Sequence, residues 1–162
     1  MRVRPASDDD WPAIWPIWRS VVDAGGTYLW PPGTTESDAR RFWMLPPPAE
    51  VLVVEDDAGA VGGTAVLKPN QPGLGDHVAN ASFMIDAARH GEGLGRALAE
   101  GVLDHARRAG YRAMQFNAVV ATNAAAIALW KSLGFEVVGT VPGGYRYPSE
   151  GPVDLLIMYR AL

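Results

Sequence analysis

The chain has 162 residues, 48% of them hydrophobic and 20% charged, which suits one globular domain over residues 1–162. Its net charge of −4 disfavours a nucleic-acid partner, because such binding normally needs a clustered basic surface. It contains no cysteine, which excludes disulfides and fits a cytoplasmic location, and its apolar runs are too short to cross a membrane.

The spacing of apolar residues and the positions of glycine and proline predict elements in the order β-α-α-β-β-β-α-β-α-β-β. Pro16 predicts a bend or break in the first helix, because proline lacks a main-chain N–H. Residues 141–150 are predicted as a loop. The order favours an α/β mixture over a doubly wound sheet. The expected strands cover 2–5, 51–55, 61–68, 77–86, 111–120, 135–140 and 153–160, and the expected helices cover 8–22, 35–44, 93–109 and 123–134.

The segment from His90 to Arg96 is the most informative part of the sequence. It reads His-Gly-Glu-Gly-Leu-Gly-Arg and joins a predicted strand to a predicted helix. About four main-chain N–H groups lack helical partners at such a helix start, and together with the helix dipole they suit a pyrophosphate. Gly91, Gly93 and Gly95 have no Cβ to hold a diphosphate away from the main chain. The same glycines could instead serve only the geometry of a tight turn.

Other ligands fit this segment less well than coenzyme A. The dinucleotide-binding fingerprint requires a third glycine where Arg96 stands, and the P-loop requires a Gly-Lys-Ser/Thr sequence that is absent. The three histidines, His77, His90 and His105, lie far apart and lack the spacing of metal ligands, so no metal site is predicted.

A second motif follows one predicted strand later, in the order Asn123, Ala126, Leu129-Trp130 and Gly134-Phe135. With the glycine-rich turn, it resembles the GCN5-related N-acetyltransferases (the GNAT family), whose motifs are Arg/Gln-x-x-Gly-x-Gly/Ala and Asn-x-x-Ala-x-x-Leu-Tyr-x-x-x-Gly-Phe. The resemblance implies the GNAT fold, a central and mostly antiparallel sheet splayed between strands 4 and 5 and flanked by about four helices. It also implies acetyl-CoA as cosubstrate and an amine as acetyl acceptor, and it is compatible with a homodimer.

The resemblance further implies which residues bind acetyl-CoA. Main-chain groups of Met84 and Ile85 would pair with the pantetheine arm, and the amides from Gly91 to Arg96 would hold the pyrophosphate. Asn123 would hydrogen-bond to the arm, cap its own helix, or do both. The full expected set is Met84, Ile85, Arg89, His90, Gly91, Gly93, Leu94, Gly95, Arg96, Asn123 and Trp130.

Two residues depart from the pattern of the family. His90 stands where arginine or glutamine is usual, so phosphate affinity would depend on main-chain amides and on Arg89 or Arg96. Trp130 stands at the tyrosine position often assigned as general acid, and an indole does not donate a proton at ordinary pH. The remaining candidates for that role are Tyr145, Tyr147, a water molecule and unaided departure of the thiolate.

Two asparagines in predicted strands are the candidates for the acceptor site. Asn80 and Asn117 are unusual there because asparagine is depleted in strands, although they could equally face solvent or bridge main-chain groups. The chain also resembles the fungal azetidine-2-carboxylate acetyltransferases, which act on proline analogues, in Lys68–Gly73 and Phe116–Val119. That likeness implies catalytic and substrate-binding roles for both asparagines. Tyr28, in a segment that resembles phosphinothricin acetyltransferases, would line the acceptor pocket.

The sequence therefore favours an acetyl-CoA-dependent N-acetyltransferase that acts on a small-molecule amine, such as an amino acid or an amino-acid-like toxin, in a detoxifying role. A protein or peptide N-acetyltransferase is one alternative, and a non-catalytic acyl-CoA-binding sensor is another. No general base emerges, because the carboxylates at strand ends are more typical of structural roles. These carboxylates are Glu55, Asp86 and Asp154.

Overall fold

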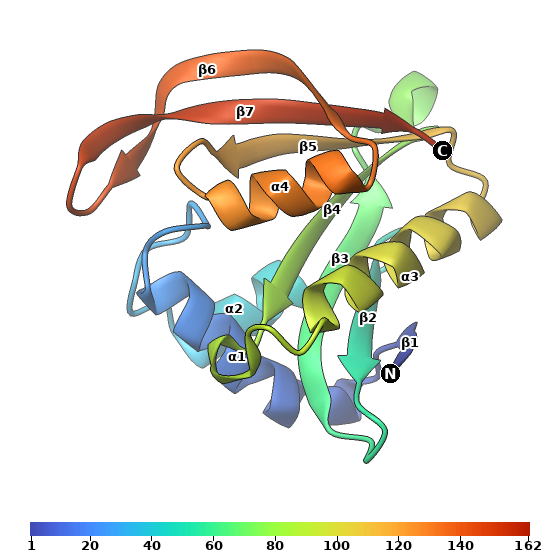
Figure 1. Cartoon of the computed structure of the whole chain (residues 1–162). Helices are drawn as coiled ribbons and strands as arrows, with labels where there is room; N and C mark the ends of the chain where they lie inside the picture. Colours follow the sequence, from blue (N-terminus) through green and yellow to red (C-terminus); the bar gives the residue numbers. More distant parts are fainter.

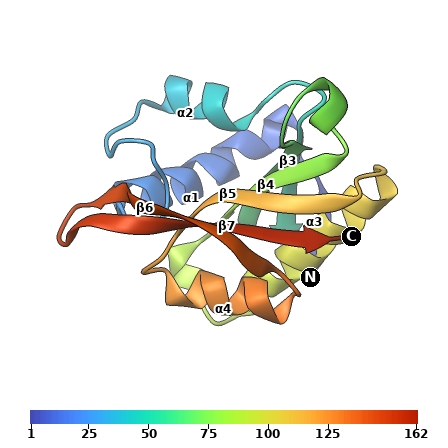
Figure 2. The same cartoon turned by 90° about the horizontal axis from the view of Figure 1, so that it is seen from above.

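A sheet of seven strands forms the middle of the protein, and helices cover both of its faces (Figures 1 and 2). The computed structural model describes residues 1–162, the whole of the printed sequence. The strands are β1 (Arg2–Pro5), β2 (Glu50–Glu55), β3 (Val61–Pro69), β4 (Val78–Ile85), β5 (Ala113–Val120), β6 (Glu136–Tyr147) and β7 (Gly151–Ala161). The helices are α1 (Trp11–Asp23), α2 (Glu36–Trp43), α3 (Leu94–Arg108) and α4 (Ala124–Ser132), with short 3-10 helices over Asp8–Asp10, Gly73–Gly75 and Ala87–Arg89. The predicted order of elements is confirmed.

The strands lie in the order β1-β2-β3-β4-β5-β7-β6, and every neighbouring pair is antiparallel except β4 and β5. These two parallel strands pair only at Val78–Ala113 and Ala79–Met114 and then diverge (Figure 1). The predicted GNAT architecture, a mostly antiparallel sheet splayed between its fourth and fifth strands, is confirmed. Because the divergence leaves strand edges without partners, it creates room for a ligand inside the sheet.

Two hydrophobic cores lie on opposite faces of the sheet, as the alternation of β2 illustrates. Leu52 and Val54 pack on the face covered by α3 and α4, whereas Val51 and Val53 pack on the face covered by α1 and α2. Figure 2 shows these two helix layers on either side of the sheet. The α3 and α4 layer carries the two sequence motifs, so both motifs lie on one face beside the diverging strands.

Side chains cap two of the helices but leave α3 uncapped. The Thr35 hydroxyl accepts a hydrogen bond from the Asp38 N–H at 3.2 Å, and the Asn123 side-chain oxygen accepts one from the Ala126 N–H at 3.2 Å. The N-cap of α3 is Gly93, which has no side chain to bond to the first turn. The N–H groups at the start of α3 are therefore available to another partner.

The structure corrects two expectations about the secondary-structure elements. A bend or a break was expected at Pro16, and the break is wrong, because helix α1 continues through this residue from Trp11 to Asp23. Proline removes a single helical hydrogen bond there, while buried Ile14 and Trp18 on either side hold the helix on the sheet.

None of the helices combines the length and apolarity that a membrane span requires.

The second correction concerns residues 141–150, which do not form a loop. They continue β6 as far as Tyr147, and only a short turn separates β6 from β7. A register shift between Val141 and Tyr145 accommodates Pro142 and Gly143, whose φ is +59°. The residues that signalled a loop are thus absorbed by an irregularity of the strand, as glycine and proline often are.

Candidate active site

The gap between β4 and β5 opens into a cavity of about 1040 Å³. Its walls come from the end of α1, the segment 24–30, the glycine-rich turn, the starts of α3 and α4, and the facing parts of β4 and β5. All but one of the predicted site residues line it. Those residues are Tyr28, Asn80, Met84, Ile85, Arg89, His90, Gly91, Gly93, Leu94, Gly95, Asn117, Asn123 and Trp130.

Arg96 is the predicted residue that does not line the cavity. Its guanidinium instead donates to the Ser132 hydroxyl at 2.9 Å and lies 3.5 Å from the Glu100 carboxylate. The side chain therefore ties α3 to the end of α4. Only the main-chain N–H of Arg96 remains at the helix start, so the expected contribution of its positive charge to the cavity is not seen.

The glycine-rich turn presents a row of main-chain N–H groups at the start of α3. Gly91 and Gly93 have φ of +89° and +83°, a left-handed conformation that favours glycine. The N–H groups of Gly91, Gly93, Leu94 and Gly95 make no main-chain hydrogen bond within the protein, and neither does that of Arg96. Aligned free N–H groups at a helix N-terminus form an anion site, so the turn fits the pyrophosphate of coenzyme A.

Gly95 differs from the other two glycines of the turn. It has no left-handed φ, and a Cβ built on it would lie 3.7 Å from Ile85 and 3.9 Å from Leu129, which are ordinary contacts. Neither turn geometry nor packing therefore requires glycine at this position.

Arg89 lines the cavity, but its charge is already paired. The guanidinium lies 2.7 Å from the Glu92 carboxylate and 3.0 Å from that of Asp56. Asp56 also accepts hydrogen bonds from the N–H groups of Ala58 and Ala60 in the turn between β2 and β3. Arg89 thus links the glycine-rich turn to a neighbouring turn. His90 is exposed at the cavity wall.

The hydrogen-bond alternation of β4 decides which main-chain groups face the cavity. The Val78 carbonyl accepts from the Asn70 N–H, and the Asp86 N–H donates to the Gly62 carbonyl, so even-numbered residues of β4 bond to the β3 side. Met84 therefore directs its N–H and C=O to β3, which corrects the expectation that they pair with the cofactor. Phe83 and Ile85 face the gap instead.

The hydroxyl of Tyr28 occupies part of this gap. It donates to the Phe83 carbonyl and accepts from the Phe83 N–H, each at 2.8 Å, so it takes the place that a paired β5 would have at this residue. Burial raises the pKa of Tyr28, which keeps the phenol neutral. Its ring stacks on Trp30 with centroids 5.1 Å apart.

A second tyrosine anchors the segment that carries Tyr28. The Tyr145 hydroxyl, from β6, lies 2.7 Å from the Gly25 carbonyl oxygen and 3.2 Å from that of Tyr28. Tyr145 is buried, and neither it nor Tyr147 lines the cavity. The geometry therefore supports a structural role for Tyr145 and offers no support for either residue as a proton donor in the cavity.

Asn80 and Asn117 stand on the two diverging strands. The Asn80 side chain donates to the Gln115 main-chain oxygen at 2.9 Å and so bridges β4 to β5. The Asn117 side chain donates to the Asn70 side-chain oxygen at 2.7 Å and accepts from the Gln115 side chain at 2.9 Å. The bridging of a main-chain group, one of the alternatives left open by the sequence, is present at Asn80, and both side chains also line the cavity.

Aromatic side chains surround Trp130, and two of them, Phe83 and Phe116, were not predicted from the sequence as site residues. This indole packs with ring centroids 4.9 Å from Phe83, 4.7 Å from Phe116 and 6.0 Å from Phe135. Phe83 and Phe116 line the cavity with it. Each adjoins a predicted site residue along a strand, but only the pairing of the strands brings them together. They form an apolar wall against which a pantetheine arm could lie.

The cavity is poor in charge. Neither aspartate nor glutamate lines it, and Arg89 is its only lysine or arginine side chain. No carboxylate is therefore placed to act as a base beside Asn80 and Asn117. No cluster of three or more His, Cys, Asp or Glu residues is arranged to hold a metal ion.

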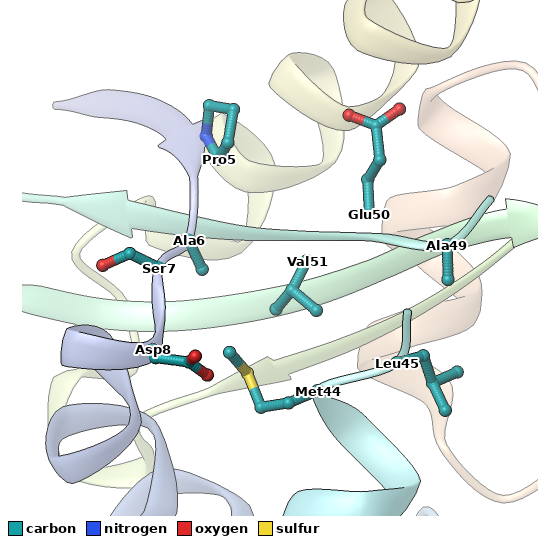
Figure 3. Close-up of a pocket in the computed structure, with 9 residues that line it drawn as sticks. All are labelled: Pro5, Ala6, Ser7, Asp8, Met44, Leu45, Ala49, Glu50 and Val51. Atoms are coloured by element: carbon teal, nitrogen blue, oxygen red, sulfur yellow. The ribbon is translucent and has the colours of Figure 1, made fainter. Parts of the chain in front are cut away.

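A smaller hollow of about 350 Å³ lies between the start of the chain and the connection from α2 to β2 (Figure 3). Its acidic groups already have partners, since Asp8 pairs with Arg40 and Glu50 with His105, each at 2.7 Å. Figure 3 shows Glu50 pointing away from Val51, to the other side of β2. No free polar group converges on this hollow, so the larger cavity is the candidate site.

Comparison with known proteins supports that choice. The model of the acetyltransferase (GNAT) family matches residues 11–135. The N-acetyltransferase aca1 of Schizosaccharomyces pombe is 38% identical over 151 residues, which cover 84% of this chain and 72% of the relative. The L-methionine sulfoximine/L-methionine sulfone acetyltransferase of Pseudomonas aeruginosa is 31% identical over 145 residues, covering 86% and 83%. The ribosomal protein bS18-alanine N-acetyltransferase of Escherichia coli is 38% identical over 77 residues, covering 48% and 51%.

Solved structures give the same result for the whole chain. A GCN5-related N-acetyltransferase from Kribbella flavida is 50% identical with a TM-score of 0.94, and the match covers 99% of this chain and 97% of that one. YncA of Salmonella typhimurium, solved with its cofactor acetyl-CoA, is 28% identical with a TM-score of 0.83, and the match covers 100% and 94%.

Proposed function

The chain belongs to the acetyltransferase (GNAT) family, and from that premise we propose that it transfers an acetyl group from acetyl-CoA to the amine of a small amino acid or amino-acid-like toxin. The observation that carries the proposal is one continuous cavity with two kinds of wall. Free main-chain N–H groups line one end, and the amide side chains of Asn80 and Asn117 line another part. The cavity thus offers partners for a diphosphate and for a polar acceptor.

The residues at the start of α3 fit coenzyme A. Gly91, Gly93, Leu94 and Gly95 have the free N–H groups that would hold the pyrophosphate. Ile85 has main-chain groups facing the gap that would pair with the pantetheine arm, while Trp130 would contribute an apolar wall. When bound, acetyl-CoA supplies the acyl thioester. In this arrangement Arg89 supports the turn through Asp56 and Glu92 rather than acting as the main phosphate ligand.

The acceptor part favours a small molecule without extra positive charge. Because no carboxylate lines the cavity, a polyamine would find no partner for its additional ammonium groups. Asn80 and Asn117 would instead orient the amine and carboxylate of an amino acid, with Tyr28 forming the wall beside them. The acetyltransferase of methionine sulfoximine and methionine sulfone provides a precedent for such an acceptor among relatives.

The acceptor amine must lose its proton for transfer to occur. No side chain in the acceptor part has a pKa suited to remove that proton, because its polar side chains are amides, hydroxyls and the neutral phenol of Tyr28. We infer that the amine is deprotonated before binding or loses its proton to water. Acetylation would then remove the charge of the amine, which is the basis for a detoxifying role.

The proposal is tested by measuring thiol release from acetyl-CoA across a panel of acceptors, with calorimetry of acetyl-CoA binding alongside. The panel contains amino acids, proline analogues, methionine sulfoximine, polyamines and peptides with a free N-terminal alanine. We expect turnover with a subset of the amino acids and analogues. Efficient turnover of peptides only would favour a protein acetyltransferase, as in the bS18-alanine relative. Binding of acetyl-CoA without turnover of any acceptor would favour a sensor.

A further inference from the structure

Three side-chain amides form a continuous hydrogen-bonded chain where β4 and β5 separate. The Gln115 side chain donates to the Asn117 oxygen at 2.9 Å, and the Asn117 nitrogen donates to the Asn70 oxygen at 2.7 Å. The main-chain oxygen of Gln115 also accepts from the Asn80 nitrogen at 2.9 Å. Asn70 follows β3, Asn80 lies on β4, and Gln115 and Asn117 lie on β5, so these hydrogen bonds connect the end of β3, β4 and β5.

Asn70 and Gln115 do not line the cavity, whereas Asn80 and Asn117 do. We propose that Asn70 and Gln115 are positioning residues that fix the rotation and the polarity of the Asn117 amide, so that Asn117 meets the carboxylate of the acceptor while Asn80 meets its amine. This inference rests on the proposed function. It specifies the orientation of the bound acceptor, with its carboxylate at Asn117 and its amine at Asn80. It also names two residues that set this orientation.

The assignment follows from which atoms remain free. Gln115 engages the side-chain oxygen of Asn117, and Asn70 engages one of its two N–H bonds. The group that Asn117 retains is its second N–H, a donor that suits a carboxylate. In Asn80 the free group is the acceptor, because the side-chain nitrogen donates to the main-chain oxygen of Gln115 and the side-chain oxygen makes no hydrogen bond in the protein. That free oxygen can accept from the N–H of an amine.

A chain of amides can in principle run in two directions, since the oxygen and the NH₂ group of each amide exchange places on rotation. The substitution Asn70→Asp leaves only acceptors at residue 70, so it enforces the direction in which the Asn117 nitrogen points to that residue. The substitution Gln115→Glu leaves only acceptors at residue 115 and enforces the opposite direction. Both substitutions keep the shape of the side chain and add one negative charge, which makes them a matched pair.

The test compares kcat and KM of both variants on an amino acid that the protein acetylates and on the same amine without its carboxylate. Gln71→Glu adds the same charge beside Asn70 without joining the amide chain, and it serves as the control. For the amino acid, we expect Gln115→Glu to lower kcat/KM at least about tenfold, mainly through KM, and Asn70→Asp to keep at least about a third of it. For the amine without a carboxylate, the two variants should differ by less than about threefold.

Melting temperature and acetyl-CoA affinity are measured for every variant. Neither quantity should differ between Asn70→Asp and Gln115→Glu. If Gln115→Glu fails to fold, Gln115→Leu removes the donor without reversing the chain, and a selective rise in the KM of the amino acid is still expected. The inference would be overturned if Asn70→Asp and Gln115→Glu lost kcat/KM equally. It would also be overturned if the loss were the same for the amino acid and for the amine without a carboxylate. Absence of turnover by the unsubstituted protein would overturn the proposed function and this inference with it.

Discussion

The two parts of the cavity differ in the groups that line them, which are main-chain N–H groups in one part and side chains in the other. The part that fits the diphosphate consists of main-chain N–H groups at the start of α3, shaped by Gly91 and Gly93. The proposed acceptor part consists of side chains, chiefly Tyr28, Asn80 and Asn117, which come from the segment 24–30, β4 and β5. A site made of main chain depends on local backbone conformation, whereas a site made of side chains depends on tertiary contacts. Substitutions should therefore affect the two parts independently, and five predictions test this.

The largest effect is expected at Gly93. Valine is strained at a φ of +83°, at a cost of about 1–3 kcal/mol, and relieving the strain would turn the N–H groups away from the diphosphate. We expect Gly93→Val to weaken acetyl-CoA binding at least about 30-fold, which is about 2 kcal/mol, by calorimetry. An unchanged affinity in a folded variant would show that the turn does not hold the cofactor.

The next effect concerns the acceptor part alone. Asn80→Ala and Asn117→Ala should each lower kcat/KM for the acceptor at least about tenfold, because each removes a group that we propose orients the substrate. Acetyl-CoA affinity should change little, since neither side chain lies at the glycine-rich turn. Steady-state kinetics with calorimetry checks both statements, and unchanged kinetics in both variants would remove these residues from the site.

Tyr28→Phe should give a smaller change. It removes a hydroxyl that makes two hydrogen bonds to Phe83, a loss of about 1–2 kcal/mol and roughly 3–6 °C in melting temperature. We expect the KM of the acceptor to rise about threefold because the wall beside it loosens, with acetyl-CoA affinity retained. A loss confined to acetyl-CoA affinity would instead place Tyr28 with the cofactor part.

Arg89→Ala distinguishes a structural link from a phosphate ligand. If the guanidinium mainly joins the two turns through Asp56 and Glu92, its loss should lower the melting temperature by only a few degrees. Acetyl-CoA affinity should then fall by less than about threefold, or under 1 kcal/mol. A strong fall in affinity, with a salt dependence reduced from that of the unsubstituted protein, would identify Arg89 as a direct ligand.

The smallest effect is expected at Gly95, the glycine of the same turn that has no left-handed φ. Alanine fits the space and favours a helix over glycine, so Gly95→Ala should stabilise the protein by up to about 1 kcal/mol. Acetyl-CoA affinity should stay within about threefold of the original value. Thermal melting and calorimetry measure both quantities, and a large loss of affinity would show that the ligand itself requires glycine there.

The same contrast explains how much of the site could be predicted from the sequence. The element order and the glycine-rich turn were predictable, because glycine spacing and a helix start are local features. The splayed sheet was expected only from the resemblance to the GNAT family. The contacts of the acceptor part were not, since Tyr28 and Phe83 are 55 residues apart in the chain and Asn70 and Asn117 are 47 apart. Asn80 and Asn117 were singled out because asparagine is uncommon in strands and because of the likeness to the azetidine-2-carboxylate acetyltransferases, and neither gave information on their partners.

The errors had related causes. Pro16 and the residues after Val141 carry strong local signals for a break and a loop, yet packing of α1 and pairing with β7 override them. Met84 was assigned to the cofactor by resemblance to the family, but only the register with β3 shows that its peptide groups point the other way. Local propensity is a weak guide wherever a tertiary partner is available.

The hydroxyl of Tyr145 has a consequence for recombination between relatives. It lies within hydrogen-bond distance of the carbonyls of Gly25 and Tyr28, which are 120 and 117 residues away in the chain. The segment around Tyr28 is therefore attached to the hairpin of β6 and β7. A chimera that exchanges one without the other keeps this contact only if the other parent has a tyrosine at the position of Tyr145. Exchanging both segments together should preserve the shape of the proposed acceptor wall. Selectivity for the acceptor would then be transferred only when both segments come from the same parent.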